Sequence, residues 1–174
     1  MVCDSQGVIH SGREDLAEYL RELLPYTNRE DRTGSLGTVL EGADVFIGVS
    51  KGNLLSAEDV STMAQDPIVL AMVNPIPEIM PDEARRGGAA VVGTGRSDFP
   101  NQINNLLAFP GIFRGAVDAG APTITAGMKI RAAKALAAAT PDPTRDRVLP
   151  DPLDRNDPQQ VAAAVALAAK ADRA

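Results

Sequence analysis

Short apolar runs alternate with helix-like segments through the first part of the chain. Three runs are continuous rather than alternating, at residues 44–49, 68–73 and 89–93. Helices are expected between them: Ser56, with Asp59 completing a partial capping box, opens one, and Pro81 begins the other. Continuous apolar strands that alternate with helices are typical of a parallel sheet covered on both faces.

Helical periodicity dominates elsewhere. Between residues 13 and 24, leucines and Tyr19 recur at helix spacing, which predicts an amphipathic helix. Further helices are expected at 110–119, 125–139 and 157–171. The proline-rich residues 141–158 are either an ordered crossing or a linker. No internal repeat and no second domain is evident.

Composition narrows the class of protein. The 174 residues are enough for one domain with a proper core. The net charge of −6 and the lack of a long basic run argue against nucleic acid as a partner. Cys3 is the single cysteine, which fits a reducing compartment, and no apolar run is long enough to span a bilayer. We therefore expect a soluble cytoplasmic protein with no membrane partner.

The block of residues 94–115 carries a dense set of candidate binding side chains. It places four side-chain amides within a few positions: Asn101, Gln102, Asn104 and Asn105. Each amide both donates and accepts hydrogen bonds, so the set suits a carboxylate or carboxamide ligand. The alternative is a loop in which these residues serve as helix caps and turn formers. A single Asn would favour that alternative, but adjacent capping roles at 104 and 105 are rarely both needed.

The carboxyl ends of the expected strands form a second candidate site, because ligands of open parallel sheets bind there. These ends carry Asp4, Ser50 and Asn74, together with residues 94–95. Asp4 is typical of the acid that accepts hydrogen bonds from an adenosine ribose. An Asx turn close to Gly7 is the alternative explanation for Asp4.

The Gly-rich loop that accompanies such an acid is missing. It belongs roughly 20 residues earlier, whereas only residues 1–3 precede Asp4, and no G-x-G-x-x-G occurs in the chain. In the usual strand order the strand leading to that loop lies in the middle of the sheet. The chain is therefore expected to be the back part of a larger protein.

Several segments together resemble bacterial malic enzymes. They are residues 2–9, 42–50, 73–79 and 94–115, the last containing Gly-Arg-Ser-Asp-Phe-Pro-Asn-Gln. The resemblance runs almost end to end. It implies NAD- or NADP-dependent oxidative decarboxylation of malate to pyruvate and CO₂, with Mg²⁺ or Mn²⁺ in the complete enzyme.

The fold implied by this resemblance is α/β. It is a Rossmann-like doubly wound parallel sheet that lacks its first strand and Gly-rich loop, with carboxyl-terminal helices. Residues 1–174 would be a partial NAD(P)-binding domain, Rossmann-like to about residue 120 and helical from about 121 to 174.

The resemblance also implies roles for individual residues. Asp4, Ser50 and Asn74 would bind the cofactor, and Asn74, Asn104 and Asn105 would bind malate. Which of Asn104 and Asn105 makes the direct contact stays open. Asp4 favours NAD, since a carboxylate repels a 2′-phosphate, but the family does not follow that rule cleanly.

The other catalytic, metal-binding and substrate-binding residues of the family are expected outside this sequence. Its proton-transfer Tyr and Lys, its acidic metal ligands and its substrate-binding Arg belong to the part before residue 1. No catalytic or metal-binding residue is therefore assigned here. Asp82 and Glu83 are interpreted as helix-start acids, and Arg96 with Asp98 as a structural pair.

Two hypotheses of different classes follow. The chain is a truncated malic enzyme with little activity of its own, or it is a non-catalytic NAD-binding or partner-binding module of a split or regulatory protein. A stand-alone small-acid binder is weaker, because its sheet would have to close without a central strand. Homo-oligomers are usual in the family, and association with the missing amino-terminal part is also expected.

Overall fold

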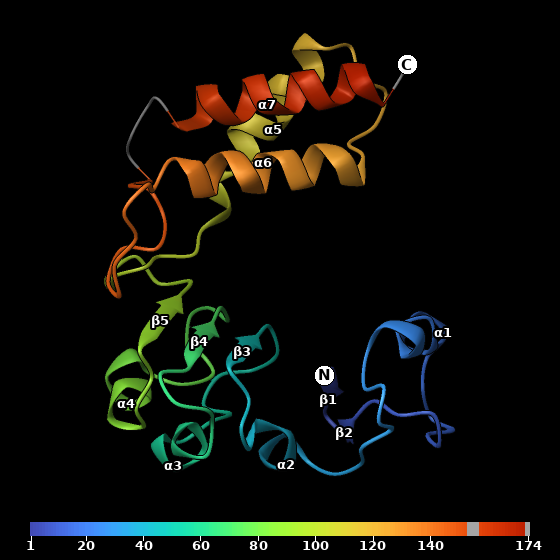
Figure 1. Cartoon of the computed structure of the whole chain (residues 1–174), viewed down its shortest axis with the longest axis vertical. Helices are drawn as coiled ribbons and strands as arrows, with labels where there is room; N and C mark the ends of the chain where they lie inside the picture. The colour runs from blue at the N-terminus through green and yellow to red at the C-terminus, as the bar shows by residue number, and fades with distance from the viewer. Residues whose placement is uncertain (153–156, 173–174) are drawn as a thin grey trace. The chain divides into compact units, whose positions relative to one another are not determined.

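The computed structural model describes residues 1–152 and 157–172. It divides into two compact units, Met1–Val92 and Gly93–Ala174 (Figure 1). The domain boundary expected near residue 120 stays a prediction.

A three-stranded sheet organises the first unit. It consists of β3 (Val45–Gly48), β4 (Ile68–Ala71) and β5 (Val91–Thr94), in the order β3-β4-β5 (Figure 1). Strands β3 and β4 are parallel, with Phe46 opposite Val69 and Gly48 opposite Ala71. All three continuous apolar runs thus form strands, which confirms the parallel α/β prediction.

Three short helices contribute to the core of this unit: α2 (Leu36–Leu40), α3 (Ala57–Ser61) and α4 (Pro81–Arg86). They share one apolar cluster with the sheet, including Leu40, Phe46, Val60, Val69 and Ala84. The predicted capping box is present, since the Ser56 hydroxyl accepts the Asp59 N–H while the Asp59 carboxylate accepts the Ser56 N–H.

The other face of β3 departs from the expectation of a sheet covered on both sides. Val45, Ile47 and Val49 are 46%, 61% and 75% exposed in the described structure. Alternating exposure along one strand means that only one face is packed. A continuous apolar run cannot reveal this, because it looks the same whether or not a partner covers the second face.

The amino-terminal segment forms a separate hairpin. Strands β1 (Cys3–Asp4) and β2 (Gly7–Val8) pair antiparallel. The prediction of one helix over residues 13–24 is wrong. Only the short helix α1 (Glu18–Arg21) and the 3₁₀ turn η1 (Leu24–Tyr26) form in this region.

The physical reason is incomplete packing, since most helical stability comes from burial of the apolar face and only Leu16 of that face is buried. Tyr19 is 67% exposed. The side chain of Arg21 donates to the carbonyl oxygens of Glu14 and Leu16 at 2.7 and 3.0 Å, and so stabilises a non-helical approach to α1.

The second unit is helical, as predicted. A 3₁₀ turn η2 (Asn105–Leu107) leads into α5 (Phe109–Asp118), followed by α6 (Ala126–Ala138) and α7 (Asp157–Ala171). Figure 1 shows these three helices packed together, with α7 in contact with both α5 and α6. Their core is built of small residues, among them Gly115, Ala116 and Ala132. None of the helices in the described part of the chain has the length and apolar character needed to cross a membrane.

Candidate functional site

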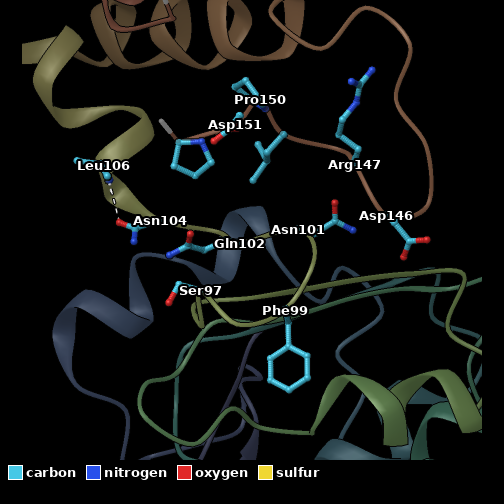
Figure 2. Close-up of a pocket in the computed structure, with 12 residues that line it drawn as sticks. Ser97, Phe99, Asn101, Gln102, Asn104, Leu106, Asp146, Arg147, Pro150 and Asp151 are labelled. Carbon is cyan, nitrogen blue, oxygen red and sulfur yellow. Dashed lines mark hydrogen bonds between the residues drawn. The ribbon is translucent and has the colours of Figure 1, made fainter. Parts of the chain in front are cut away.

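A pocket of about 720 Å³ lies in the second unit, between the amide block and the proline-rich segment (Figure 2). Two stretches that are far apart in the sequence form its walls. One contributes Ser97, Gln102 and Asn104, and the other contributes residues 146–147 and 149–152. The lining thus mixes polar side chains with apolar ones, the latter including Phe99, Leu106 and Leu149, and it includes a cation, Arg147.

Asn101 ties the two walls together. Its side chain is nearly buried, at 7% exposure for the residue. Its Nδ2 donates to the carbonyl oxygen of Arg145 at 2.7 Å, and its Oδ1 accepts the Val148 N–H at 2.8 Å. The described residues 141–152 are thus an ordered crossing rather than a linker, whereas residues 153–156 of that expectation lie outside the described residues.

The start of the amide block is fixed against the end of β5. The Ile103 N–H donates to the carbonyl oxygen of Thr94 at 2.8 Å, and the Thr94 N–H donates to that of Asn101 at 3.3 Å. These bonds extend the sheet geometry into the loop, which turns the side chains of 102 and 104 toward the pocket (Figure 2).

Arg96 and Asp98 form the predicted structural pair. Their side chains are joined by two hydrogen bonds, from Nε at 2.9 Å and from Nη2 at 2.7 Å. The guanidinium holds the pKa of the Asp98 carboxyl below its usual value. Arg96 also lies over the ring of Phe99, 5.3 Å from its centroid, so this pair shapes the loop beside the pocket.

Asn104 and Asn105 have different surroundings. The Oδ1 of Asn104 accepts the Leu106 N–H at 2.9 Å, so Asn104 caps η2, and the same side chain lines the pocket (Figure 2). Asn105 is exposed and is not among the lining residues. The capping explanation therefore applies to Asn104, and a role of the same side chain in binding stays a prediction.

In the first unit, Glu78 joins the ends of β3 and β4. Its carboxylate accepts the N–H of Ser50 at 3.0 Å and the N–H of Val73 at 3.2 Å. Asn74 follows Val73, is exposed, and precedes Pro75 through a cis peptide bond. Two of the predicted cofactor residues are thereby brought to one edge of the sheet.

Sequence reasoning missed Glu78. The available signal was a lone acidic residue between Pro77 and Ile79, inside an otherwise apolar stretch. Such a residue is costly to bury without hydrogen bonds, so its presence there indicates a specific acceptor role.

Asp4 ends β1 and is bound by Arg13, a second residue that sequence reasoning missed. The Oδ1 of Asp4 also accepts the Gln6 N–H at 2.8 Å. This is the contact of an Asx turn, the alternative explanation for Asp4. The guanidinium of Arg13 keeps the pKa of the Asp4 carboxyl below its usual value. The ribose contact of Asp4 stays a prediction.

A metal site would need several His, Cys, Asp or Glu side chains close together. Within residues 1–152 and 157–172, no three or more His, Cys, Asp or Glu side chains are grouped so that they could hold an ion. The described residues therefore do not form a metal site by themselves.

Comparison with known proteins gives a consistent result. The family model described as "Malic enzyme, NAD binding domain" matches residues 1–171. The bifunctional malic/malolactic enzyme of Bacillus subtilis is 51% identical over 172 residues, which cover 97% of this chain and 42% of that protein. The NADP-dependent malic enzyme of Halomonas elongata is 41% identical and covers 97% of this chain and 43% of its own length.

Solved structures agree. The NAD-dependent malic enzyme of Thermotoga maritima has a TM-score of 0.88 at 44% identity, covering 92% of this chain and 42% of its own. The malic enzyme of Entamoeba histolytica has a TM-score of 0.92 at 39% identity, covering 98% of this chain and 37% of its own. The chain thus spans less than half the length of each of these proteins.

Proposed function

This chain belongs to the malic enzyme family, in which it matches the NAD-binding domain, and on that premise we propose that it is part of an NAD(P)-dependent malic enzyme. The whole enzyme would oxidatively decarboxylate malate to pyruvate and CO₂. The observation that carries the proposal is the family match over residues 1–171, together with relatives named as NAD- and NADP-dependent malic enzymes.

The cofactor would be NAD or NADP, held at the sheet edge by Ser50 and Asn74, with Asp4 toward its ribose. When bound, it would supply an acceptor for the hydride that leaves C2 of malate. Support for this placement comes from Glu78, which brings Ser50 and the residue before Asn74 to the same edge.

Malate would be bound by Asn74 and by the amide block. Of the two adjacent asparagines, we favour Asn104 for the direct contact. Its Oδ1 is occupied by the Leu106 N–H, so the Nδ2 donor of the same amide is left on the opposite side, and the side chain lines the pocket (Figure 2). A carboxylate ligand needs donors rather than acceptors, so this orientation suits malate.

The metal ligands and the acid–base residues of the complete enzyme would come from outside this chain. Two observations support association with such a part: β3 is an edge strand of the described sheet, and one face of that strand exposes Val45, Ile47 and Val49. A further strand and its covering helices would bury this face. Homo-oligomer formation is proposed as well.

A chimera tests the proposal most directly. The segment of the Bacillus subtilis bifunctional enzyme that matches this chain, 42% of that protein, is replaced by this chain, and malate-dependent NAD and NADP reduction is measured with Mn²⁺. We expect clear turnover by the chimera and turnover near background by the chain alone. A folded chimera without activity would contradict the proposal.

The alternative is a non-catalytic NAD-binding or partner-binding module of a split or regulatory malic enzyme-like protein. Co-purification from the native host separates the two. A stable partner chain that carries a Gly-rich loop and acidic metal ligands supports the module, whereas a single longer polypeptide supports the malic enzyme.

A further inference from the structure

Glu78 is a fully buried carboxylate, at 0% exposure. It follows β4 in the chain, but its side chain reaches back across the ends of two strands. One oxygen accepts the N–H of Ser50, just beyond β3, and the other accepts the N–H of Val73, just beyond β4. A single side chain therefore fixes the distance between the two loops that leave the carboxyl edge of the sheet.

Backbone contacts around Glu78 strengthen the same connection. Its carbonyl oxygen accepts the N–H groups of Leu54 and Leu55 at 2.7 and 2.9 Å, and that of Pro77 accepts the Asn53 N–H at 3.0 Å. The loop after β3 and the loop after β4 are thus joined by main chain on one side and by a carboxylate on the other.

Gly48 shows that the carboxylate position is built into the strand. A Cβ atom added at Gly48 would lie 2.6 Å from Oε1 and 2.8 Å from Cγ of Glu78. Any side chain at this position would displace the carboxylate. The end of β3 therefore accommodates Glu78 only because residue 48 is glycine.

The energetics indicate a purpose beyond filling space. Burial of a carboxylate is costly, and an apolar side chain of similar size would fill the same volume without that cost. What an apolar side chain cannot do is accept hydrogen bonds from two N–H groups, as Glu78 does at 3.0 and 3.2 Å. The gain from Glu78 is the orientation of two peptide groups rather than burial.

We propose that Glu78 is a positioning residue of the cofactor site, which holds Ser50 and the peptide leading into Asn74 in the geometry that receives the nicotinamide cofactor. The inference rests on the proposed function. It assigns no direct contact between Glu78 and the cofactor, because the side chain is enclosed beneath the loops that it orients.

The first experiment uses the full chain and two variants, Glu78→Gln and Glu58→Gln. Gln keeps the size of Glu but replaces one acceptor oxygen with a donor, which opposes one of the two N–H groups. Glu58 is exposed in the first turn of α3 and provides the matched control. Amide ¹H–¹⁵N spectra are expected to show an upfield shift in Glu78→Gln only, at whichever of Ser50 and Val73 loses its acceptor. Unchanged resonances for both would overturn the proposal.

The second experiment places Glu78→Gln in the chimera described above. A merely structural role would lower the amount of active enzyme, and hence kcat, without changing KM. Positioning predicts a KM for NAD raised on the order of tenfold, because misplaced contact groups weaken binding. An unchanged KM for NAD in an active chimera would overturn the positioning role of Glu78 and leave the proposed function standing. An inactive parent chimera contradicts the proposed function, and the positioning role with it.

Discussion

The guanidinium of Arg13 binds both carboxylate oxygens of Asp4, with Nη1 2.8 Å from Oδ1 and Nη2 2.9 Å from Oδ2. This two-point contact joins the end of β1 to the segment in which a longer helix was expected. Arg13 also pairs with Asp15, so one cation is shared by two carboxylates. The amino-terminal hairpin is therefore held by charge as well as by its two backbone-paired strands.

Replacement of Asp4 by Asn tests this contact through its pH dependence. Arg13 lowers the pKa of Asp4 in the folded chain from its usual 3.8. The stabilisation is therefore complete above pH 3.8 and is lost as the pH falls through the lower folded-state pKa. Urea unfolding from pH 7 to pH 3 should show wild type more stable than Asp4→Asn at pH 7, with the difference shrinking at the acid end.

The control for this prediction is Asp142→Asn, at an exposed aspartate. We expect the stability of this variant to equal that of wild type at every pH from 7 to 3. A difference between wild type and Asp4→Asn that stays constant down to pH 3 would contradict an ionic role for Asp4.

Gly115 on α5 allows close approach of α7. A Cβ atom there would lie 2.8 Å from Cβ of Val165 and would also meet the carbonyl oxygen of Ala162. Gly115→Ala is therefore expected to destabilise the helical unit by about 1–3 kcal/mol, since overpacking outweighs the better helix propensity of alanine. Helix content followed by circular dichroism during urea unfolding measures the effect.

Gly37→Ala is the matched control for this change. Gly37 also lies within a helix, α2, but the nearest atom to an added Cβ is the Ser35 hydroxyl at 3.7 Å. Here the variant should be neutral or more stable by up to about 1 kcal/mol. Equal effects at both positions would show that helix propensity, rather than packing against α7, governs Gly115.

The sheet and most helices were predictable because their signals are local. Ser56 and Asp59 cap α3 within one turn, and each strand of the three-stranded sheet is a continuous apolar run. The failed helix at residues 13–24 has the right periodicity, but of the leucines and Tyr19 on its apolar face only Leu16 is buried in the described structure. Periodicity reports which face could be buried, not whether anything covers it.

The supports of the candidate site were not predictable, because they join residues distant in the sequence. Glu78 bonds to Ser50 across 28 positions, and Asn101 bonds to Arg145 and Val148 across 44 and 47. No local pattern encodes such pairs. The candidate ligand-binding residues could be proposed from a motif, whereas the residues that orient them needed the folded chain.

Asn101 is expected to control the order of the crossing segment. Its backbone φ is +54°, which glycine also adopts easily, so Asn101→Gly removes the side-chain bonds without adding backbone strain. Loss of these two part-buried hydrogen bonds should cost about 1–3 kcal/mol in total, at about 0.5–1.5 kcal/mol each. Hydrogen exchange of the Val148 amide should become markedly faster, because that N–H donates to Oδ1 of Asn101.

Asn53→Gly provides the comparison for Asn101→Gly. Asn53 has a φ of +53° and is exposed, so the backbone change is the same while little packing is lost. Its effect on stability and on exchange at Val148 should be small. If Val148 exchanges equally slowly in wild type and Asn101→Gly, the proposed anchoring of residues 145–148 is wrong.

The two asparagines at 104 and 105 can be separated by charge rather than by deletion. Asn104→Asp keeps the oxygen that accepts the Leu106 N–H, so η2 stays capped and the melting temperature of the chain should hardly change. The amide donor is lost, however, and a carboxylate now faces the pocket. Repulsion of the malate carboxylate should lower kcat/KM for malate in the chimera by roughly 10- to 100-fold.

Asn105→Asp introduces the same charge at the neighbouring exposed position, outside the pocket lining. Because water screens a charge there, the change in kcat/KM for malate should stay below about threefold. Steady-state kinetics of both chimeras across malate concentrations make the comparison, with KM for NAD as the internal reference. A larger loss at 105 than at 104 would reverse the assignment and place the malate contact at the start of η2.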